Sequence, residues 1–404
     1  MKIAYITAHA PFGRGETFVL EEMLAVAELG ADLLIVPRNP PKEVFHDPGR
    51  QLLDRTVWLP LFSAGICLAF LKAVILKPRL WKVLTNIFRH SRTPKILVKN
   101  LAIAPKAVFI ADLLRQAKVQ HIHAHWGSTT ATMAWIASEL TGIPWSMTLH
   151  RWDIAEDNLL RLKVEGAAFV RCISEDGRRE VLRIVGDQYQ HKVKVLHMGV
   201  RLPDTPPAQL RPPRPAFVVA CPANLVRVKG HRFLIEACAL LRERDVHNFK
   251  CLIIGDGPLD EELRQRSKAL GLNDVVQFLG RLSHRELIQM YGRGEVDVVV
   301  LPSIVTENGE KEGIPVALME AMAYGIPVIS TETGGIPELL GGGAGLLVPP
   351  GSSQALAEAI VKIMRDESLR TQLARSGRAK VETDFNLKLN TEKLLELMKG
   401  TCSR

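Results

Sequence analysis

The sequence is poor in the features that mark secreted or membrane-spanning proteins. Its six cysteines include no CxxC pair, and most lie in apolar runs, as buried thiols do in a reducing compartment. The longest apolar stretch, residues 61–76, contains Lys72 and is shorter than the about 20 apolar residues that a membrane span needs. The first residues form a strand-like run without the basic and apolar regions of a signal peptide. These absences predict a cytoplasmic protein.

Acidic residues are scarce in one basic segment of the chain. The formal net charge is +9, and between Lys72 and Lys118 the only acid is Asp112. A basic balance favours anionic partners. Two interpretations fit this segment: a helix with a solvated basic side, or a surface helix lying on an anionic membrane, at its inner face. We expect no nucleic-acid partner, because no stacking platform or known nucleic-acid-binding signature is visible.

Short apolar runs alternate with amphipathic stretches along the whole chain. Runs rich in Val, Ile and Leu are typical of strands buried on both faces of a parallel sheet. Their alternation with helical periods predicts an α/β fold of doubly wound, Rossmann-like domains. The strand-like runs are residues 2–7, 31–36, 121–125, 145–150, 217–220, 250–255, 275–279 and 296–301, and helical periods include 231–244 and 355–365.

A proline-rich break at residues 202–216 divides the alternation into two halves. Such a segment suits an extended linker, so we expect an N-terminal domain over residues 1–204 and a C-terminal domain over 205–384. Residues 385–404 form a last helix that we expect to pack back on the N-terminal domain. Open α/β sheets bind ligands at the carboxyl ends of their strands, so two facing domains predict an interdomain cleft.

The segment from Glu312 to Gly325 carries two carboxylates in a specific pattern. Pro315 suits a helix start and Gly325 a helix end, which places Glu312 in the preceding loop and Glu320 inside the helix. Eight residues separate the carboxylates by roughly 12 Å along the axis, and the free N–H groups of the helix start lie between them. That layout suits a sugar, a diphosphate and a ribose in succession. Taken alone, the glutamates also fit an ordinary helix start.

The stretch LPSIVTENGEKEGIPVALMEAMAYGIPVISTETGGIPELL resembles the donor-site signature of the retaining glycosyltransferases of family 4, which have the GT-B fold. The similarity covers nearly the whole chain and is strongest from Val219 to Asp366. Within that family the chain is most similar to enzymes of bacterial exopolysaccharide synthesis of the colanic-acid type. The resemblance implies a UDP- or GDP-sugar donor, no cofactor, and a saccharide or lipid-linked saccharide acceptor. It also implies that the domain over residues 1–204 lies on the acceptor side and that the domain over 205–384 binds the nucleotide sugar.

The resemblance also implies the site residues. Glu312 would bind the transferred sugar, Glu320 the ribose, and Lys229 the diphosphate, where an ammonium stabilises the leaving charge. His150 would contact the primary hydroxyl of the sugar. The catalytic residues would be Glu312, His150 and Lys229; the donor-binding residues would be Gly15, Asn224, Arg227, Lys229, Gly255, Arg281, Leu282, Gly313, Ile314, Pro315 and Glu320.

One position departs from the family pattern. The family has an arginine five residues before the lysine, and this chain has Asn224 there. An amide supplies neither charge nor a guanidinium fork. Arg227 is our candidate to reach the phosphates instead.

Three histidines, His121, His123 and His125, alternate along one predicted strand and so share a face. Metal binding is the less favoured interpretation, because no cysteine or acid lies nearby in the sequence. We see no DxD-type acid cluster, which fits a metal-independent site.

The resemblance implies retention at the anomeric carbon. No carboxylate in these motifs is an evident nucleophile, so we favour front-face attack with the departing phosphate oxygen helping to take the proton of the acceptor. Two alternatives remain open. One is a sugar-nucleotide epimerase or hydrolase on the same architecture. The other is a non-catalytic protein that binds sugar nucleotides or polyanions, which Asn224 keeps open.

Overall fold

The computed structural model describes residues 1–13, 16–40, 44, 47–203 and 215–402. The chain divides into two compact units, which are described separately. The first comprises Met1–Met198 together with Leu387–Arg404, and the second comprises Gly199–Asn386. Most of the proline-rich segment predicted as a linker, residues 204–214, lies outside the described residues.

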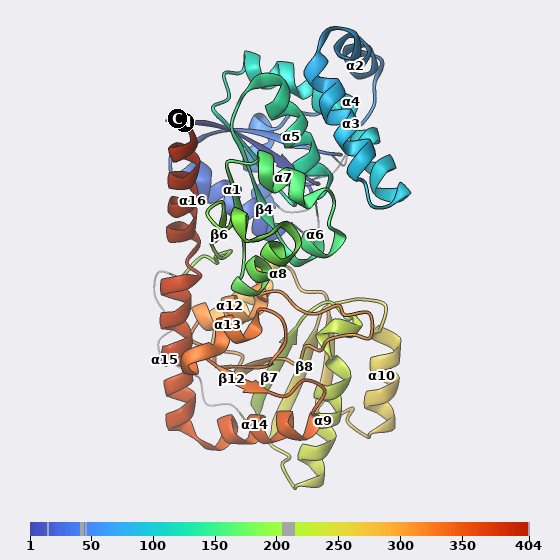
Figure 1. The fold of residues 1–404 in the computed structure, drawn as a ribbon. Helices are drawn as coiled ribbons and strands as arrows, with labels where there is room; N and C mark the ends of the chain where they lie inside the picture. The colour runs from blue at the N-terminus through green and yellow to red at the C-terminus, as the bar shows by residue number, and fades with distance from the viewer. Residues whose placement is uncertain (14–15, 41–43, 45–46, 204–214, 403–404) are drawn as a thin grey trace. The chain divides into compact units, whose positions relative to one another are not determined.

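The first unit is built around a six-stranded parallel sheet with helices on both faces (Figure 1). Its strand order is β2-β1-β3-β4-β5-β6. The strands are β1 Lys2–Thr7, β2 Asp32–Pro37, β3 His121–His125, β4 Trp145–Leu149, β5 Phe169–Cys172 and β6 Val193–Val195. The α-helices are α1 Thr17–Glu28, α2 Ala64–Leu76, α3 Pro78–His90, α4 Pro94–Gln116, α5 Thr129–Thr141, α6 Arg151–Glu156, α7 Leu160–Gly166, α8 Glu175–Val185 and α16 Leu387–Cys402, and the 3₁₀ segments are η1 Asp47–Arg55 and η2 Asp187–Tyr189.

The last helix, α16, belongs to the core of the first unit. Leu394, Leu395 and Met398 are buried in one apolar cluster with Val19 and Met23 of α1. The chain therefore begins and ends in the same unit.

The second unit holds another six-stranded parallel sheet, in the order β12-β11-β10-β7-β8-β9. Its strands are β7 Phe217–Pro222, β8 Phe249–Ile254, β9 Val276–Gly280, β10 Val298–Leu301, β11 Val328–Thr331 and β12 Leu346–Val348. The helices are α9 His231–Glu243, α10 Asp260–Ala269, α11 His284–Gly292, α12 Val316–Ala323, α13 Ile336–Leu340, α14 Ser353–Arg365 and α15 Glu367–Asp384, with 3₁₀ segments η3 Arg227–Lys229 and η4 Gly341–Gly343.

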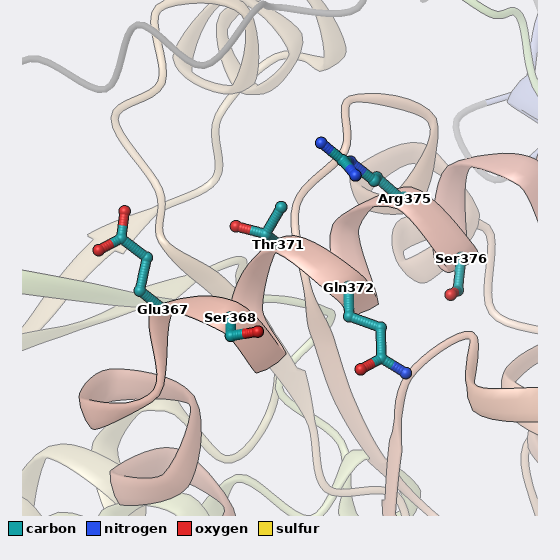
Figure 2. Close-up of a pocket in the computed structure, with 6 residues that line it drawn as sticks. All are labelled: Glu367, Ser368, Thr371, Gln372, Arg375 and Ser376. Atoms are coloured by element: carbon teal, nitrogen blue, oxygen red, sulfur yellow. The ribbon is translucent and has the colours of Figure 1, made fainter.

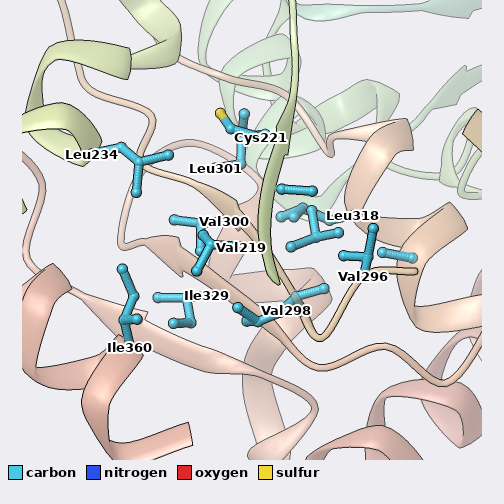
Figure 3. Close-up of a cluster of buried hydrophobic side chains, with 14 of the residues drawn as sticks. Val219, Cys221, Leu234, Val296, Val298, Val300, Leu301, Leu318, Ile329 and Ile360 are labelled. Atoms are coloured by element: carbon cyan, nitrogen blue, oxygen red, sulfur yellow. The ribbon is translucent and has the colours of Figure 1, made fainter. Parts of the chain in front are cut away.

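Apolar side chains on both faces of this second sheet make the core that sequence periodicity predicts (Figure 3). Val298, Val300 and Ile329 are wholly buried in the strands, and Leu234 of α9 and Leu318 of α12 cover them from the helices. The prediction of doubly wound α/β domains is confirmed, and the predicted strands agree with those of the structure within two residues at either end.

Candidate functional site

The candidate site lies where the strand order of the second sheet reverses, between β7 and β10. Doubly wound sheets bind ligands at this switch point, outside the carboxyl ends of the strands. The loops that follow these two strands meet there, because the N–H of Ile304 donates to the carbonyl of Val228 at 2.9 Å. Gly230, at φ +67°, approaches so closely that a Cβ would lie 1.9 Å from the carbonyl oxygen of Pro302. The two loops therefore form one continuous surface.

Lys229 and Glu312 come from these two loops and face each other. Lys229 ends the η3 turn, and Glu312 lies in the loop before α12. Their side chains form an ion pair and remain 20% and 16% exposed. The Lys229 ammonium can stabilise the charge of a leaving phosphate. The Glu312 carboxylate beside it can accept hydrogen bonds from sugar hydroxyls.

The loop that carries Glu312 rests on the turn after β11. Gly334, at φ +54°, leaves so little room that a Cβ would lie 1.8 Å from the carbonyl oxygen of Glu312. At Gly335 a Cβ would lie 2.7 Å from Cγ1 of Ile314. These two glycines let the turn after β11 contact the Glu312 loop closely, and this contact fixes the position of that loop.

Replacing Gly334 by alanine should therefore destabilise the second unit and displace Glu312. We expect a loss of roughly 1–3 kcal/mol in the free energy of unfolding, from the steric clash and the left-handed backbone, together with weaker donor binding. Denaturant unfolding and calorimetry measure both. Gly271→Ala is the matched control, since Gly271 also has a left-handed φ of +66° but no atom within 4 Å of its added Cβ. Equal losses in both variants would contradict the role of the close approach.

The start of α12 lies between the two glutamates, as the sequence predicts. Pro315 is the N-cap residue, and α12 runs from Val316 to Ala323 with Glu320 inside it. The first N–H groups of a helix have no acceptor within the helix and form its positive end. Gly313 and Ile314 lie in the loop directly before this positive end, so the segment can hold an anion between Glu312 and Glu320.

Glu320 is held by polar neighbours. Its Oε1 lies 2.7 Å from Nε2 of His284 on α11. Burial, and then the nearby Glu320 carboxylate, raise the pKa of Tyr291 well above its usual value and also raise that of Tyr324. Both phenols therefore stay protonated at neutral pH.

Asn224 lies in the loop after β7 and Arg227 begins η3, and both are exposed. Within the described residues, the guanidinium of Arg227 has no hydrogen-bond or ion-pair partner. Gly255 begins the turn after β8 and contacts the same loop, since a Cβ at Gly255 would lie 2.1 Å from the carbonyl oxygen of Ala223. Gly255 therefore supports the loop that carries Asn224.

Arg281 and Leu282 follow β9 at the same edge of the sheet. The Arg281 guanidinium lies 3.8 Å from the Asp256 carboxylate, with both side chains exposed. Leu282 packs against the core of the unit. The N–H of Gly255 donates to the carbonyl of Gly280 at 2.8 Å, so the turns after β8 and β9 are joined.

Three buried polar side chains of this unit were not among the site residues predicted from the sequence. His231, Ser303 and Tyr291 each carry buried side-chain atoms that have no hydrogen-bond partner within the described part of the chain. Burial, and then Lys229, lower the pKa of His231 to about 4, so its imidazole is neutral. Unpartnered buried polar groups are rare and tend to mark functional places. The sequence signal for His231 was its position directly after Lys229-Gly230.

The first sheet has its own switch point, between β1 and β3. The Glu16 carboxylate accepts three hydrogen bonds there. They come from Trp126 Nε1 at 2.5 Å and from the backbone N–H groups of His9 and Ala10 at 2.8 and 2.6 Å. Gly15, predicted to bind donor, lies outside the described residues. Glu16 was not singled out from the sequence, although it directly follows the predicted Gly15.

A buried network lies behind this edge. Glu22 accepts from Arg171 and, at 3.0 Å, from the hydroxyl of Tyr5. Burial alone would raise the pKa of Glu22, but Arg171 and His125 outweigh it and hold this pKa well below its usual range. Glu22, His123 and His125 lie close enough together to be compared with a metal site. The guanidinium of Arg171 already pairs with the Glu22 carboxylate. A metal ion bound by these three residues would be repelled by the positive charge of that guanidinium.

The histidines of β3 are satisfied mainly by protein hydroxyls. His121 Nε2 and His123 Nδ1 lie 2.7 and 2.8 Å from Oγ of Ser146, and His123 Nε2 lies 3.0 Å from Oγ1 of Thr148. They share one face, as the alternation predicts. Hydrogen bonds within the protein account for His121 and His123, whereas Nδ1 of His125 lies 3.5 Å from Oε1 of Glu22.

His150 follows β4, and its backbone N–H donates to the Asp153 carboxylate at 3.0 Å. Its Nε2 lies 2.8 Å from Nε2 of His125, so one of these nitrogens donates to the other. Burial lowers the pKa of His150 well below its usual value, and burial raises that of Asp153 to about 6. His150 is therefore a neutral group, suited to hydrogen bonding rather than to carrying charge.

Several buried histidines should make the protein sensitive to acid. Burial lowers the pKa of His121 to about 3 and that of His231 to about 4. The unfolded chain therefore binds more protons below about pH 6.5, so stability is present above that pH and is lost as the pH falls. Each such histidine lowers the free energy of unfolding by about 1.4 kcal/mol for each pH unit below its unfolded pKa. The raised pKa of Asp153, about 6, has the opposite effect below pH 6.

We expect the free energy of unfolding to fall by at least about 2 kcal/mol between pH 7 and pH 5. Urea denaturation at the two pH values measures this change. His121→Gln should flatten the dependence, because the glutamine does not titrate. Greater stability at pH 5 than at pH 7 would contradict the prediction.

A hollow of about 460 Å³ opens along α15 (Figure 2). It is lined by Glu367, Ser368, Thr371, Gln372, Arg375 and Ser376. All six come from a single helix, and none is a predicted site residue, so this hollow is not our candidate site.

Two doubly wound six-stranded units define the GT-B fold class. Among solved structures, the chain matches Anabaena Alr3699/HepE in complex with UDP at a TM-score of 0.72 and 19% identity, covering 99% of this chain and 100% of that one. It matches a glycosyltransferase from Rickettsia africae ESF-5 at 0.70 and 19%, covering 99% and 98%. At these identities the likeness shows the fold.

Sequence comparisons give the family. The family described as Glycosyl transferases group 1 matches residues 205–380. The amylovoran biosynthesis glycosyltransferase AmsK of Erwinia amylovora is 30% identical over 422 residues, covering 98% of this chain and 99% of that protein. WcaL of Escherichia coli (strain K12), named as a glycosyltransferase of colanic acid biosynthesis, is 28% identical and covers 99% and 100%. The chain belongs to the group 1 glycosyltransferases, and the resemblance seen in the sequence is confirmed.

Proposed function

We propose that this glycosyltransferase moves a hexosyl group, with retention and without a metal, from a UDP- or GDP-sugar to a saccharide acceptor in bacterial surface polysaccharide synthesis. The names of AmsK and WcaL support the polysaccharide role. The Anabaena protein, solved with UDP and with UDP-glucose, supports a nucleotide-sugar donor. The observation that carries the proposal is the Lys229–Glu312 pair beside the start of α12.

In the proposed reaction, the diphosphate lies at the start of α12 and against Lys229. The bond between the anomeric carbon and the phosphate oxygen breaks, and its electron pair leaves with the nucleotide diphosphate. The acceptor hydroxyl oxygen bonds to the same face of that carbon, and its proton passes to the departing phosphate oxygen. Lys229 and the helix start stabilise the charge that develops on the phosphate.

The glutamates hold the two ends of the donor. Glu312 accepts hydrogen bonds from hydroxyls of the transferred sugar, and Glu320 accepts them from the ribose. Arg227, exposed beside Asn224, supplies the charge that the family arginine would provide. His150, neutral and joined to His125, hydrogen-bonds the primary hydroxyl of the sugar.

Lys229 and the N–H groups of α12 neutralise the leaving group, which supports catalysis without a metal. A lipid-linked saccharide acceptor at the inner membrane face completes the proposal.

A non-catalytic sugar-nucleotide-binding protein is the second candidate, favoured by Asn224 in place of the family arginine. A panel of UDP- and GDP-sugars, tested for thermal stabilisation and for slow hydrolysis, separates the two. The proposal expects one donor both to stabilise the protein and to be cleaved, with the same anomeric configuration in donor and product by NMR. Stabilisation without cleavage, with or without acceptor saccharides, would favour the binding protein.

An inverted product would contradict retention. Conversion of the donor to an isomeric nucleotide sugar would show an epimerase. Loss of cleavage in EDTA, restored by a divalent ion, would contradict the metal-independent mechanism.

A further inference from the structure

We propose that helices α2, α3 and α4 form a surface by which this protein docks, without crossing, on an anionic lipid leaflet. The docking surface consists of their exposed apolar and basic side chains. The apolar members are Leu68, Leu71, Ile75, Leu76, Trp81, Phe88, Val98 and Leu101, and the basic members are Lys72, Arg79, Lys82, Arg89 and Lys95.

Helix α2 is apolar on the face that its own unit does not cover. Ile66 and Ala73 are buried against the unit. On other sides of the helix, Ile75 is 81% exposed and Leu76 73% exposed. A surface helix normally turns polar residues outward, and one that is apolar all round is normally covered. The packing of the first unit therefore leaves α2 without the cover that its sequence requires.

The exposed residues of α2 follow helical spacing. Leu68, Leu71, Lys72 and Ile75 are separated by three and four residues and so form one stripe. The stripe holds a lysine beside apolar side chains, and a lysine stem can lie along apolar surface while its ammonium reaches outward. This pattern suits a helix lying in the plane of a membrane interface.

Helix α3 continues the surface. Trp81 Nε1 donates to the carbonyl of Val74 on α2 at 2.7 Å, so the exposed indole lies directly beside α2. Phe88, seven residues further on, is 70% exposed, and Lys82 and Arg89 form the neighbouring row. Aromatic rings flanked by cations are the composition that favours a membrane–water interface.

Helix α4 adds a third stripe of the same kind. Lys95, Val98 and Leu101 recur every three residues and are all exposed, Val98 at 65%. The three helices contact one another and lie together at one edge of the first unit (Figure 1). Their other faces supply buried residues, including Leu80 and Val83 of α3, so the exposed side chains are additional to the core.

The charge of this region decides between a membrane and a protein partner. From Arg55 to Ala111 the sequence contains neither Asp nor Glu. Lys72, Arg79, Lys82, Arg89 and Lys95 have no ion-pair partner among the residues that the structure describes. A symmetric dimer through this surface would bring these cations against themselves. An anionic leaflet neutralises them while it covers the apolar side chains.

The occupant is a leaflet surface, since in the described chain no helix is long and apolar enough to span a membrane. The docking surface stands on its own geometry. Its role in bringing the enzyme to a lipid-linked acceptor rests on the proposed function.

Vesicle co-sedimentation tests the proposal without donor or acceptor, so its result is independent of the proposed reaction. The probes are phosphatidylcholine vesicles with and without one third phosphatidylglycerol, at low and high salt. We expect binding to the anionic vesicles, at least tenfold weaker binding to the neutral ones, and weakening by salt. Equal binding to both kinds of vesicle, or none to either, would overturn the proposal.

Two double variants test the two halves of the surface. Leu71→Asp/Ile75→Asp removes apolar contacts and should abolish binding to anionic vesicles. Lys82→Glu/Arg89→Glu should weaken it more than 20-fold, since each cation contributes roughly fivefold near an anionic surface. The matched controls are Leu270→Asp and Lys268→Glu in the second unit, both at exposed positions, which should bind as the unaltered protein does.

Two further readouts make the test decisive. Thermal unfolding and donor hydrolysis should be unchanged in both double variants, because none of these residues belongs to the candidate site. Gel filtration tests the alternative occupant. A dimer or larger assembly that dissociates in Leu71→Asp/Ile75→Asp, with vesicle binding unchanged, would overturn the proposal and identify a protein interface.

Discussion

Lys229→Ala is expected to lower kcat for sugar transfer about 100- to 1,000-fold, the loss seen when one preorganised group that stabilises a developing negative charge is removed. The ammonium lies beside Glu312, where the loops after β7 and β10 meet. A fixed cation there helps the leaving diphosphate more than the intact donor, because charge on the phosphate grows as the glycosidic bond breaks. The effect should therefore fall mainly on kcat, measured by nucleotide release with saturating donor.

Two controls separate this loss from a general defect. Lys268→Ala removes an exposed lysine of α10 and should leave kcat unchanged. Lys229→Arg keeps a cation and should recover part of the activity, although a guanidinium is shaped differently. A Lys229→Ala enzyme that turns over at the unaltered rate would remove this lysine from the mechanism.

Glu312→Gln and Glu320→Gln should impair different steps. Glu312 faces Lys229 at the loop, so its loss should lower kcat about 100-fold with a small change in nucleotide affinity. Glu320 lies eight residues further along, beside His284. Loss of a charged acceptor for the ribose should weaken nucleotide binding about tenfold to 100-fold. Steady-state kinetics and calorimetry with UDP and GDP measure the two effects.

The test depends on the difference between the two variants: one should lose mainly kcat and the other mainly nucleotide affinity. Glu396→Gln, at an exposed glutamate of α16, is the control and should change neither quantity. If Glu320→Gln lowered kcat without weakening nucleotide binding, the assigned order of sugar, phosphate and ribose along α12 would be wrong.

The sequence predicted the central strands well because they are buried on both faces. β1, β8 and β10 are runs of mostly apolar or β-branched residues with few competing patterns. The strands β5, β6, β11 and β12 were not singled out. β6 and β12 are three residues long and partly exposed, so their sequences do not differ clearly from those of loops.

The candidate site was predictable where its residues are close in the chain. Glu312, Pro315 and Glu320 lie within one segment, and helix signals alone fixed their arrangement. The support for that segment was not predictable, because Gly334 meets the carbonyl of Glu312 only once β11 has folded beside β10. The buried pair of Glu22 and Arg171 joins residues 149 positions apart, a separation at which local periodicity carries no information.

The structure of the protein with its donor tests the central claim most directly. We predict the diphosphate at the start of α12 with an oxygen within hydrogen-bond distance of Lys229 Nζ, the transferred sugar against Glu312, and the ribose against Glu320. Donor density elsewhere, with residues 312–320 making no contact to it, would contradict the account.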